Sequence, residues 1–409
     1  MDFQKFNLHP HVAAGVMAAK YSTPTPIQSQ AIPPVMQGLD VMGLAQTGTG
    51  KTAAFVLPVL DRLMQGPRGR VRALVIAPTR ELSEQIHQTV KTLGKQTRLR
   101  SVTVYGGVSG HAQAEQLKRG AEIVIACPGR LLDHIGQRTV NLSGLEMLIL
   151  DEADRMFDMG FLPDIRRIMT HVPEKRQTLM FSATMPDDIR RLASDILQEP
   201  VTIQIDHAAP ASTVAHALYP VGQELKTRLL LGLLRQTDTG SVLVFTRTKH
   251  RAKRVSDQLQ SAGFRCASLQ GNLSQNRRQA ALKGFRNGAY QILVATDIAA
   301  RGIDVSGISH VINFDMPDSV DSYTHRIGRT GRASKTGDAF TFATREDAEM
   351  VRNIERVLGE KIERRFLEGF DYGIPTQQME TAFASQPRPA QQIRRVFAPK
   401  TRRYSNSMH

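Results

Sequence analysis

The sequence predicts an α/β protein of two tandem domains, each a parallel sheet covered by helices, with a cleft between them. Its 409 residues are long enough for two hydrophobic cores. Short apolar runs, typical of buried strands, alternate with segments of helical length. This alternation stops near residues 206–213 and then begins again. The interruption indicates two structural units joined by a linker.

In the first unit (residues 1–206), a loosely helical stretch precedes a proline-punctuated entry to the sheet around Pro24, Pro26, Pro33 and Pro34. Because strands and helices then alternate, we expect a parallel sheet with both faces covered. Strands are expected at 41–45, 73–77, 101–105, 123–126, 147–150 and 178–181, and helices at 3–19, 52–64 and 81–93, with further helical segments between the later strands.

The second unit (residues 214–373) follows a small, Pro-containing linker at 207–213. It lacks a second phosphate-binding loop, so it is either a degenerate copy of the first fold or a cap that completes the first domain's site. Strands are expected at 242–245, 265–269, 291–295, 310–314 and 339–343, and helices at 250–262 and 275–285.

The charge of the chain points to a polyanionic partner. The net charge is +15 and the pI about 10.1. Residues 374–409 carry six basic side chains and one acidic one in a Gln-, Pro- and Ser-rich tail that is expected to be disordered. This tail either tethers the polyanionic partner electrostatically or is a solvated end.

Cysteine usage and hydropathy exclude several classes of protein. Cys127 and Cys266 lie far apart, so the sequence offers neither a zinc motif nor a disulfide framework. The N-terminus lacks the pattern of a signal peptide, and we find no apolar run long enough to span a bilayer. We therefore expect a cytoplasmic protein that does not enter a membrane.

A phosphate-binding loop lies between the first strand and the helix that follows it, at Ala45-Gln46-Thr47-Gly48-Thr49-Gly50-Lys51-Thr52. Ala45 replaces the glycine that usually opens this motif. Backbone amides at the helix N-terminus would hold phosphates. Lys51 is expected to reach the β- and γ-phosphates, and the Thr52 hydroxyl is expected to ligate Mg²⁺.

An acidic cluster follows the buried strand at 147–150, about a hundred residues after the loop. Open α/β sheets bind ligands at the carboxyl ends of their strands. Asp151 suits the Mg²⁺ shell, with contact through water, and Glu152 suits the orientation and deprotonation of an attacking water. Asp154 is left to pair with nearby donors. Loop and cluster together predict nucleotide hydrolysis.

With these two motifs, the stretches Pro78–Leu82, Ser182–Thr184 and His325–Arg332 resemble the DEAD-box RNA helicase family. The resemblance covers the chain from about Phe3 to about Gly369. The compact two-domain chain with its short basic tail resembles the bacterial RhlE-type subgroup. It implies two tandem RecA-like domains and an RNA-stimulated hydrolase acting on ATP with Mg²⁺.

The resemblance also implies how the nucleotide is held. Gln28 would pair with adenine N6 and N7 and select ATP over GTP, and Tyr21 would stack on the base. Phe3 matches the family's isolated upstream aromatic residue, although core packing explains it equally well. Asp304 would meet the ribose or the arginine fingers. In the loop, the nucleotide would contact Thr47, Gly48, Thr49, Gly50, Lys51 and Thr52.

The same resemblance makes Arg329 and Arg332 arginine fingers that reach the γ-phosphate from the second domain. Asp154 would bond the hydroxyls of Ser182 and Thr184 and, with His325, couple nucleotide chemistry to domain closure. The active site is therefore expected to be split between the domains and complete only when they close.

The RNA contacts implied by the resemblance are glycines, hydroxyls and arginines at strand ends. Such groups suit a phosphate–ribose backbone, so binding is expected to be independent of sequence. Two departures from the family pattern are Cys127, in place of a common Thr, and Gln270, in place of a common His. The implied contacts are Pro78, Thr79, Arg80, Gly106, Gly107, Pro128, Gly129 and Arg130 in the first domain, and Thr246, Arg247, Gly271, Gln275, Arg278 and Thr296 in the second.

Three functions remain to be separated. The first is an RNA-dependent ATPase that opens short RNA duplexes locally and without processivity. The second is an ATP-gated RNA clamp or annealing chaperone. The third is a DNA helicase, which the Gln28 motif, the Pro78–Leu82 pattern and the lack of a cysteine cluster disfavour. The cellular RNA and the protein partners are not specified by the sequence.

Overall fold

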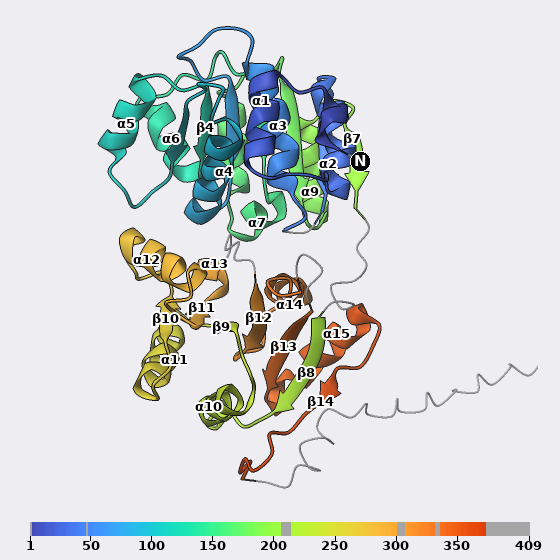
Figure 1. The fold of residues 1–409 in the computed structure, drawn as a ribbon, viewed down its shortest axis with the longest axis vertical. Coiled ribbons are helices and arrows are strands. Elements are labelled where there is room, and N and C mark those ends of the chain that lie inside the picture. The colour runs from blue at the N-terminus through green and yellow to red at the C-terminus, as the bar shows by residue number, and fades with distance from the viewer. Residues whose placement is uncertain (1, 46–47, 206–213, 301–306, 332–335, 374–409) are drawn as a thin grey trace, which may run out of the picture.

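The computed structural model describes residues 2–45, 48–205, 214–300, 307–331 and 336–373. It contains two α/β domains, each built on a seven-stranded parallel sheet with helices on both faces (Figure 1). The predicted fold class is therefore confirmed. Among the described residues, no helix is both long and apolar enough to cross a membrane.

The sheet of domain 1 has the strand order β3-β4-β2-β5-β6-β1-β7. Its central strands are short and apolar because helices cover both faces. The strands are β1 (Val41–Leu44), β2 (Ala73–Ile76), β3 (Ser101–Val104), β4 (Ile123–Ala126), β5 (Met147–Leu150), β6 (Gln177–Ser182) and β7 (Val201–Gln204). The helices are η1 (Phe3–Phe6), α1 (Pro10–Ala18), α2 (Pro26–Met36), α3 (Lys51–Leu63), α4 (Arg80–Leu93), α5 (Gly110–Lys118), α6 (Pro128–Gly136), α7 (Ala153–Asp158), α8 (Leu162–Met169) and α9 (Asp187–Ile196).

Most of the proline-containing entry to the sheet forms a helix, α2, which the sequence analysis did not identify. Thr25 and Gln28 form a capping box, and Pro26 occupies the first turn, where its missing N–H is harmless. A buried apolar face holds the remainder against the sheet, although Pro33 and Pro34 lie inside the helix. The preceding stretch is also divided, into η1 and α1, because Asn7 adopts a left-handed conformation.

The sheet of domain 2 has the order β10-β11-β9-β12-β13-β8-β14. Renumbered from its own first strand, this order is that of domain 1, so the second half is a copy of the first fold without its phosphate loop. The strands are β8 (Val214–Pro220), β9 (Ser241–Phe245), β10 (Cys266–Leu269), β11 (Ile292–Ala295), β12 (Ile308–Asn313), β13 (Gly337–Ala343) and β14 (Glu363–Arg364). The helices are α10 (Lys226–Gln236), α11 (Lys249–Ser261), α12 (Gln275–Arg286), α13 (Asp297–Ala300), α14 (Val320–Ile327), η3 (Arg345–Asp347) and α15 (Ala348–Leu358).

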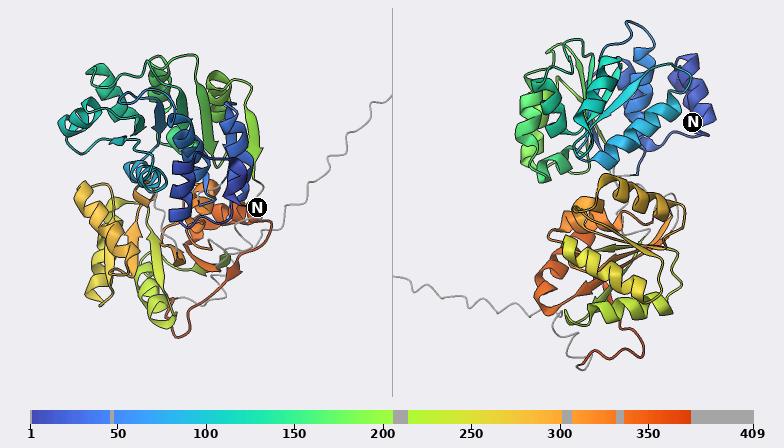
Figure 2. Two further views of the ribbon diagram at one scale, coloured as in Figure 1. Left: turned by 45° about the horizontal axis from the view of Figure 1, so that its top comes forward. Right: turned by 90° about the vertical axis from the view of Figure 1, so that its left-hand side faces the viewer.

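The two domains face each other through defined elements. Figures 1 and 2 show α12, α13 and α14 on the side of domain 2 that faces domain 1. The arrow of β7 points toward domain 2, so the carboxyl edge of the parallel sheet of domain 1 faces domain 2 (Figure 1). The predicted linker (207–213) and tail (374–409) lie outside the described residues, and the domain boundaries stay predictions.

Candidate active site and nucleic-acid groove

The phosphate loop joins β1 to α3 through two glycines with left-handed backbone conformations, Gly48 (φ 88°) and Gly50 (φ 95°). A Cβ on Gly50 would lie 2.5 Å from the Gln28 side-chain nitrogen, so only glycine fits. The buried Lys51 ammonium donates to the Ala45 carbonyl at 2.6 Å. The lysine therefore lies over the loop where a phosphate would sit. Thr47 lies outside the described residues.

Gln28 and Tyr21 line a cavity of about 190 Å³, which the phosphate loop also lines. The Gln28 amide donates to the Gly50 carbonyl at 3.1 Å and accepts from the Thr25 N–H at 3.0 Å, which fixes its orientation. One N–H and one lone pair of the amide remain for a base. Tyr21 is 39% exposed, and its ring packs 6.0 Å from the buried ring of Phe3.

Two buried carboxylates close the cavity opposite the loop. Burial raises the pKa of Asp151 to about 7, and the Lys51 cation works against this rise. Burial alone would also raise the pKa of Glu152, but the cations of Arg155, Lys51 and Arg329 hold it below its ordinary value. A further cation at Asp151 would lower its pKa again and favour the carboxylate, and this donor set, with the Thr52 hydroxyl in the same cavity, fits Mg²⁺.

Asp154 is bonded to the Ser182–Thr184 segment that follows β6. Its carboxylate accepts from the Ala183 N–H at 3.0 Å, the Thr184 N–H at 2.9 Å and the Thr184 hydroxyl at 3.2 Å. The Ser182 hydroxyl behaves differently from the expectation, because it accepts from the Asp154 N–H and donates to the Thr184 carbonyl. The two segments are thus joined through backbone groups more than through hydroxyls.

Domain 2 brings α14 against these carboxylates. Arg329 is buried and lies close enough to Glu152 to affect its pKa, and His325 lies beside Arg155. Arg155, His325 and Arg329 together line a small cavity between the domains. Domain 2 therefore contributes charge directly to the site on domain 1. Arg332 and Asp304 lie outside the described residues.

Acidification is expected to destabilise this interface through His325. Burial and the Arg155 cation lower its pKa to about 4, against an ordinary value of about 6.5. Between these values the unfolded chain binds a proton at His325 that the folded chain does not. The contribution of His325 to the free energy of unfolding is therefore fully present above about pH 6.5 and is lost as the pH falls toward 4. Asp151, whose pKa is raised, acts with the opposite sign over this range, so the contribution of His325 is measured as a difference: from pH 7.5 to 5 the melting temperature of the wild type should fall relative to that of His325→Gln. Equal slopes would contradict the prediction.

A second cavity, a groove of about 340 Å³, lies between the domains and is lined by residues at the start of α4. The residues predicted to contact RNA that line it are Pro78, Thr79, Arg80, Gly106, Gly129, Arg130, Gly271 and Arg278, together with Cys127. Burial raises the pKa of the Cys127 thiol to about 11, and its sulfur lies 3.6 Å from the Ser83 hydroxyl. It is therefore neutral.

The groove is bridged by side chains from both domains. Arg278 of α12 pairs with Glu81 of α4 at 2.8 Å, and both are largely buried. Arg80 donates to the Gln275 side chain at 3.4 Å and packs on Gly107, where a Cβ would lie 2.1 Å from the guanidinium. Three of these four bridging residues, Arg80, Gln275 and Arg278, are predicted to contact RNA.

Replacing Glu81 by glutamine is expected to open the RNA-free protein. The closed form would then bury the Arg278 cation without its partner, at a cost of about 3–5 kcal/mol, which opening avoids. The closed population, measured by energy transfer between dyes on the two domains, should fall about 100-fold or more. Glu84→Gln is the matched control, because the Glu84 carboxylate accepts hydrogen bonds from Thr103 and Tyr105, both within domain 1. The same closed population in both variants would contradict the prediction.

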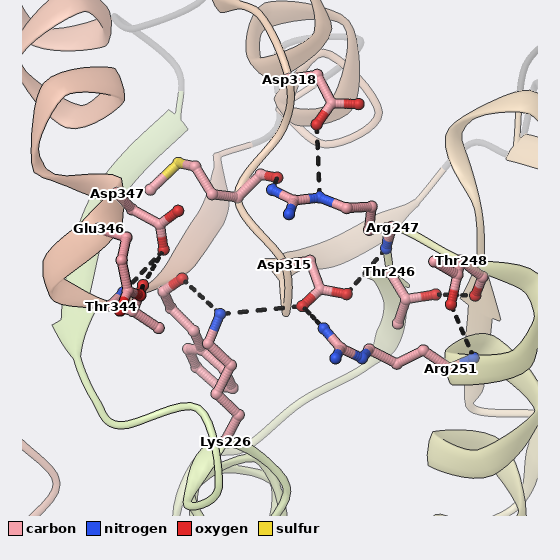
Figure 3. Close-up of polar contacts among 12 residues, drawn as sticks. Lys226, Thr246, Arg247, Thr248, Arg251, Asp315, Asp318, Thr344, Glu346 and Asp347 are labelled. Atoms are coloured by element: carbon pink, nitrogen blue, oxygen red, sulfur yellow. Dashed lines mark hydrogen bonds and ion pairs between the residues drawn. The ribbon is translucent and has the colours of Figure 1, made fainter.

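The remaining predicted RNA contacts of domain 2 lie outside this groove. The buried Asp315 carboxylate accepts from the Arg247 N–H at 2.9 Å and from the Arg251 guanidinium at 2.6 Å, with Lys226 at 3.9 Å (Figure 3). The half-exposed Arg247 side chain lies 3.5 Å from Asp318. Thr246 and Thr296 are buried at the ends of β9 and β11, and Gln270 accepts from the Asn272 N–H.

Three charged residues of the site were not identified from the sequence. Arg155 pairs with Glu152 at 3.2 Å, Glu81 pairs across the groove, and Arg326 pairs with Asp297 through two contacts of 2.6 Å. The Glu152–Arg155 spacing of three residues on α7 was the one sequence signal for such a pair. The others depend on contacts between distant segments.

Comparisons with known proteins agree with this architecture. The family models for DEAD/DEAH box helicase and helicase conserved C-terminal domain match residues 25–192 and 225–334. The DEAD-box ATP-dependent RNA helicase CshA of Bacillus cereus is 42% identical over 92% of this chain and 72% of that protein. CshA of Bacillus subtilis is 40% identical over 93% of this chain and 77% of that protein.

Solved structures resemble both domains at once. S. cerevisiae Dbp5 bound to RNA and ADP BeF3 is 27% identical, with a TM-score of 0.80 over 94% of this chain and all of that chain. Mss116p bound to ssRNA and AMP-PNP has a TM-score of 0.81 over 94% of this chain and 82% of that chain; at 24% identity it bears on the fold alone. The RhlE-type subgroup stays a prediction.

Proposed function

Because this chain belongs to the DEAD-box family of ATP-dependent RNA helicases, we propose that it couples RNA-stimulated ATP hydrolysis to closure of its two domains and to local, non-processive opening of RNA duplexes. The observation that carries this proposal is the division of the site. Lys51, Asp151 and Glu152 lie on domain 1. Arg329 of domain 2 lies close enough to Glu152 to help lower its pKa.

The nucleotide site supplies hydrolysis. The loop amides and Lys51 bind the phosphates, while Thr52 and Asp151 would hold Mg²⁺, which neutralises charge on the phosphates when bound. Glu152, which remains ionised, orients the attacking water and accepts its proton. Arg329 stabilises charge on the γ-phosphate only when domain 2 is docked, so hydrolysis depends on closure.

The groove supplies the RNA dependence. It is lined by both domains, so an RNA strand that fills it stabilises the closed form and the complete ATP site together. RNA must displace the Arg278–Glu81 and Arg80–Gln275 contacts, after which the arginines can bind phosphates. Its backbone-type contacts favour single strands of any sequence. A duplex would lose one strand on closure and be released after hydrolysis reopens the domains.

The experiment that tests the proposal measures ATP turnover and opening of a short RNA duplex in the same reactions. RNA should raise turnover, DNA of equal length should raise it less, and GTP should not replace ATP if Gln28 reads adenine. Lys51→Ala should abolish both activities. Turnover that is indifferent to RNA, together with duplex opening that survives Lys51→Ala, would overturn the proposal. A cytoplasmic location and a role of the tail stay predictions.

A further inference from the structure

A strongly basic surface lies on domain 1 at the end opposite the cleft. It is formed by the four segments that lead into β2, β3, β4 and β5, residues 64–72, 94–100, 118–122 and 137–146, and we call it the amino-edge face. These segments contain nine cations and two carboxylates, so they carry +7 of the net charge of +15. The exposed cations are Arg68, Arg70, Lys95, Arg98, Arg100, Lys118, Arg119 and Arg138.

The two carboxylates do not neutralise the exposed cations. Glu146 pairs with the ninth cation, the buried Arg72, through contacts of 2.6 and 3.0 Å. Glu122 is 3% exposed and accepts from the N–H groups of Gly69 at 2.7 Å and Arg100 at 2.8 Å. Its charge is therefore used to join three of the four segments, which fixes the positions of the cations around it.

Helix dipoles explain only part of this charge. Lys118 and Arg119 lie at the C-terminus of α5, where cations are stabilised. Arg68 and Arg70 lie at least five residues beyond the end of α3, and Arg98 and Arg100 at least five beyond the end of α4. The dipole effect is confined to the last turn of a helix. These four cations therefore require another explanation.

Two of the arginines occupy unfavourable backbone positions. Arg98 (φ 58°) and Arg138 (φ 54°) adopt the left-handed conformation that glycine adopts most easily. Arg138 directly follows Gln137, the C-cap residue of α6. The position after a C-cap is the usual place for such a glycine. Non-glycine residues in this region tend to mark functional sites, where the strain is retained for the side chain.

The face also has a cavity of about 340 Å³, which is lined by three of its four segments, 64–72, 118–122 and 137–146. Arg70, Arg138, Asn141 and Ser143 line it, above an apolar floor formed in part by Leu117. None of the large exposed hydrophobic side chains of the described residues lies on these four segments. A protein partner would need such an apolar anchor, whereas phosphates need the planar donors that arginine provides. The surface therefore fits a polyphosphate backbone.

We propose that the amino-edge face is a second RNA-binding surface, which holds the backbone of a duplex arm flanking the strand in the groove. It goes beyond the proposed function, because that function needs only the groove. The groove lies at the carboxyl edge of the same sheet, and α4, with 14 residues, separates the two edges by about 20 Å. A short strand in the groove cannot reach the face, but a structured RNA that continues around domain 1 can.

The test compares a short single strand with the same strand joined to a long hairpin. We expect the hairpin to raise affinity in the wild type and much less in Arg68→Gln/Arg70→Gln/Arg138→Gln. Loss of three phosphate contacts should lower hairpin affinity about tenfold or more at moderate salt. It should also reduce the salt slope, which is the slope of log affinity against log salt concentration, by about 2 to 3 in magnitude. Affinity for the short strand and the ATP turnover it stimulates should not change.

Arg235→Gln/Arg352→Gln/Arg356→Gln is the matched control, because these exposed arginines lie on α10 and α15 of domain 2. Equal hairpin affinity and salt slope in the wild type and the amino-edge variant would overturn the inference. An acidic protein partner would give that result. If the short strand failed to stimulate the wild type, the proposed function would fail, and the hairpin comparison would still decide the second surface.

Arg138→Gly separates RNA binding from stability. Glycine removes one cation and relieves the left-handed backbone, so the melting temperature should rise by about 2–4 °C while hairpin affinity falls. A variant that is more stable and binds the hairpin less tightly cannot be explained by misfolding. A more stable variant with undiminished hairpin affinity would count against Arg138 as a contact and against the face.

Discussion

Replacing Arg329 by alanine is expected to lower RNA-stimulated ATP turnover by about 10³–10⁵-fold, the range found for arginine fingers in other nucleotide hydrolases. Arg329 is 3% exposed and is held between α14 and the carboxylate cluster of domain 1. In the closed form its cation lies in a dry environment, where an interaction with developing phosphate charge is strong. Turnover without RNA should change less, because RNA favours the closed form in which Arg329 acts.

Arg329→Lys keeps the charge but loses the planar fork, so it should restore only part of the activity. Arg352→Ala, on the exposed side of α15, is the control for loss of an arginine from domain 2. ATP affinity measured without RNA should remain within a few-fold of the wild type in all three variants. A loss confined to ATP binding, with unchanged turnover at saturation, would contradict the role of Arg329 in catalysis.

The central strands were predictable because each is a short apolar run between helices. Ile123–Ala126 and Met147–Leu150 were predicted to the residue. One edge strand of each sheet was not predicted, whereas the opposite edges, β3 and β10, were expected at 101–105 and 265–269. β7 alternates between exposed and buried positions over four residues, and β14 has two residues that pair only with β8. Such strands form because a neighbouring strand offers free hydrogen-bonding groups, which a local pattern does not reveal.

The site, like the fold, has parts that local sequence predicts and parts that it does not. The loop and the carboxylates follow strands directly, so their positions depend on local sequence. The contacts of Asp154 with the Ser182–Thr184 segment were expected from the family resemblance, but other partners that join distant segments were not found. Glu81–Arg278 is the clearest case, because about 200 residues separate its members. Glu81 reads as an ordinary acidic residue in the first turn of α4. Only the docking of domain 2 turns it into an interdomain contact.

Replacing Glu152 by glutamine is expected to slow ATP hydrolysis by about 10²–10⁴-fold while ATP and RNA remain bound. The amide is nearly the same size as the carboxylate, but it cannot accept the proton of the attacking water. Glu152 is 4% exposed and pairs with Arg155 at 3.2 Å, so the geometry should survive the exchange. Single-turnover hydrolysis and the lifetime of the RNA complex are the two measurements.

This variant distinguishes a helicase from an ATP-gated clamp. In the cycle that we propose, closure requires only that ATP and RNA bind, so Glu152→Gln should hold RNA longer than the wild type and open a stoichiometric amount of duplex once. Repeated opening needs hydrolysis to release the domains, so multiple-turnover unwinding should be lost. If the variant instead remodelled RNA through many cycles at the wild-type rate, hydrolysis would be incidental and the clamp would describe the protein better. Glu84→Gln, within the same domain but away from the nucleotide, should leave both the lifetime and the unwinding unchanged.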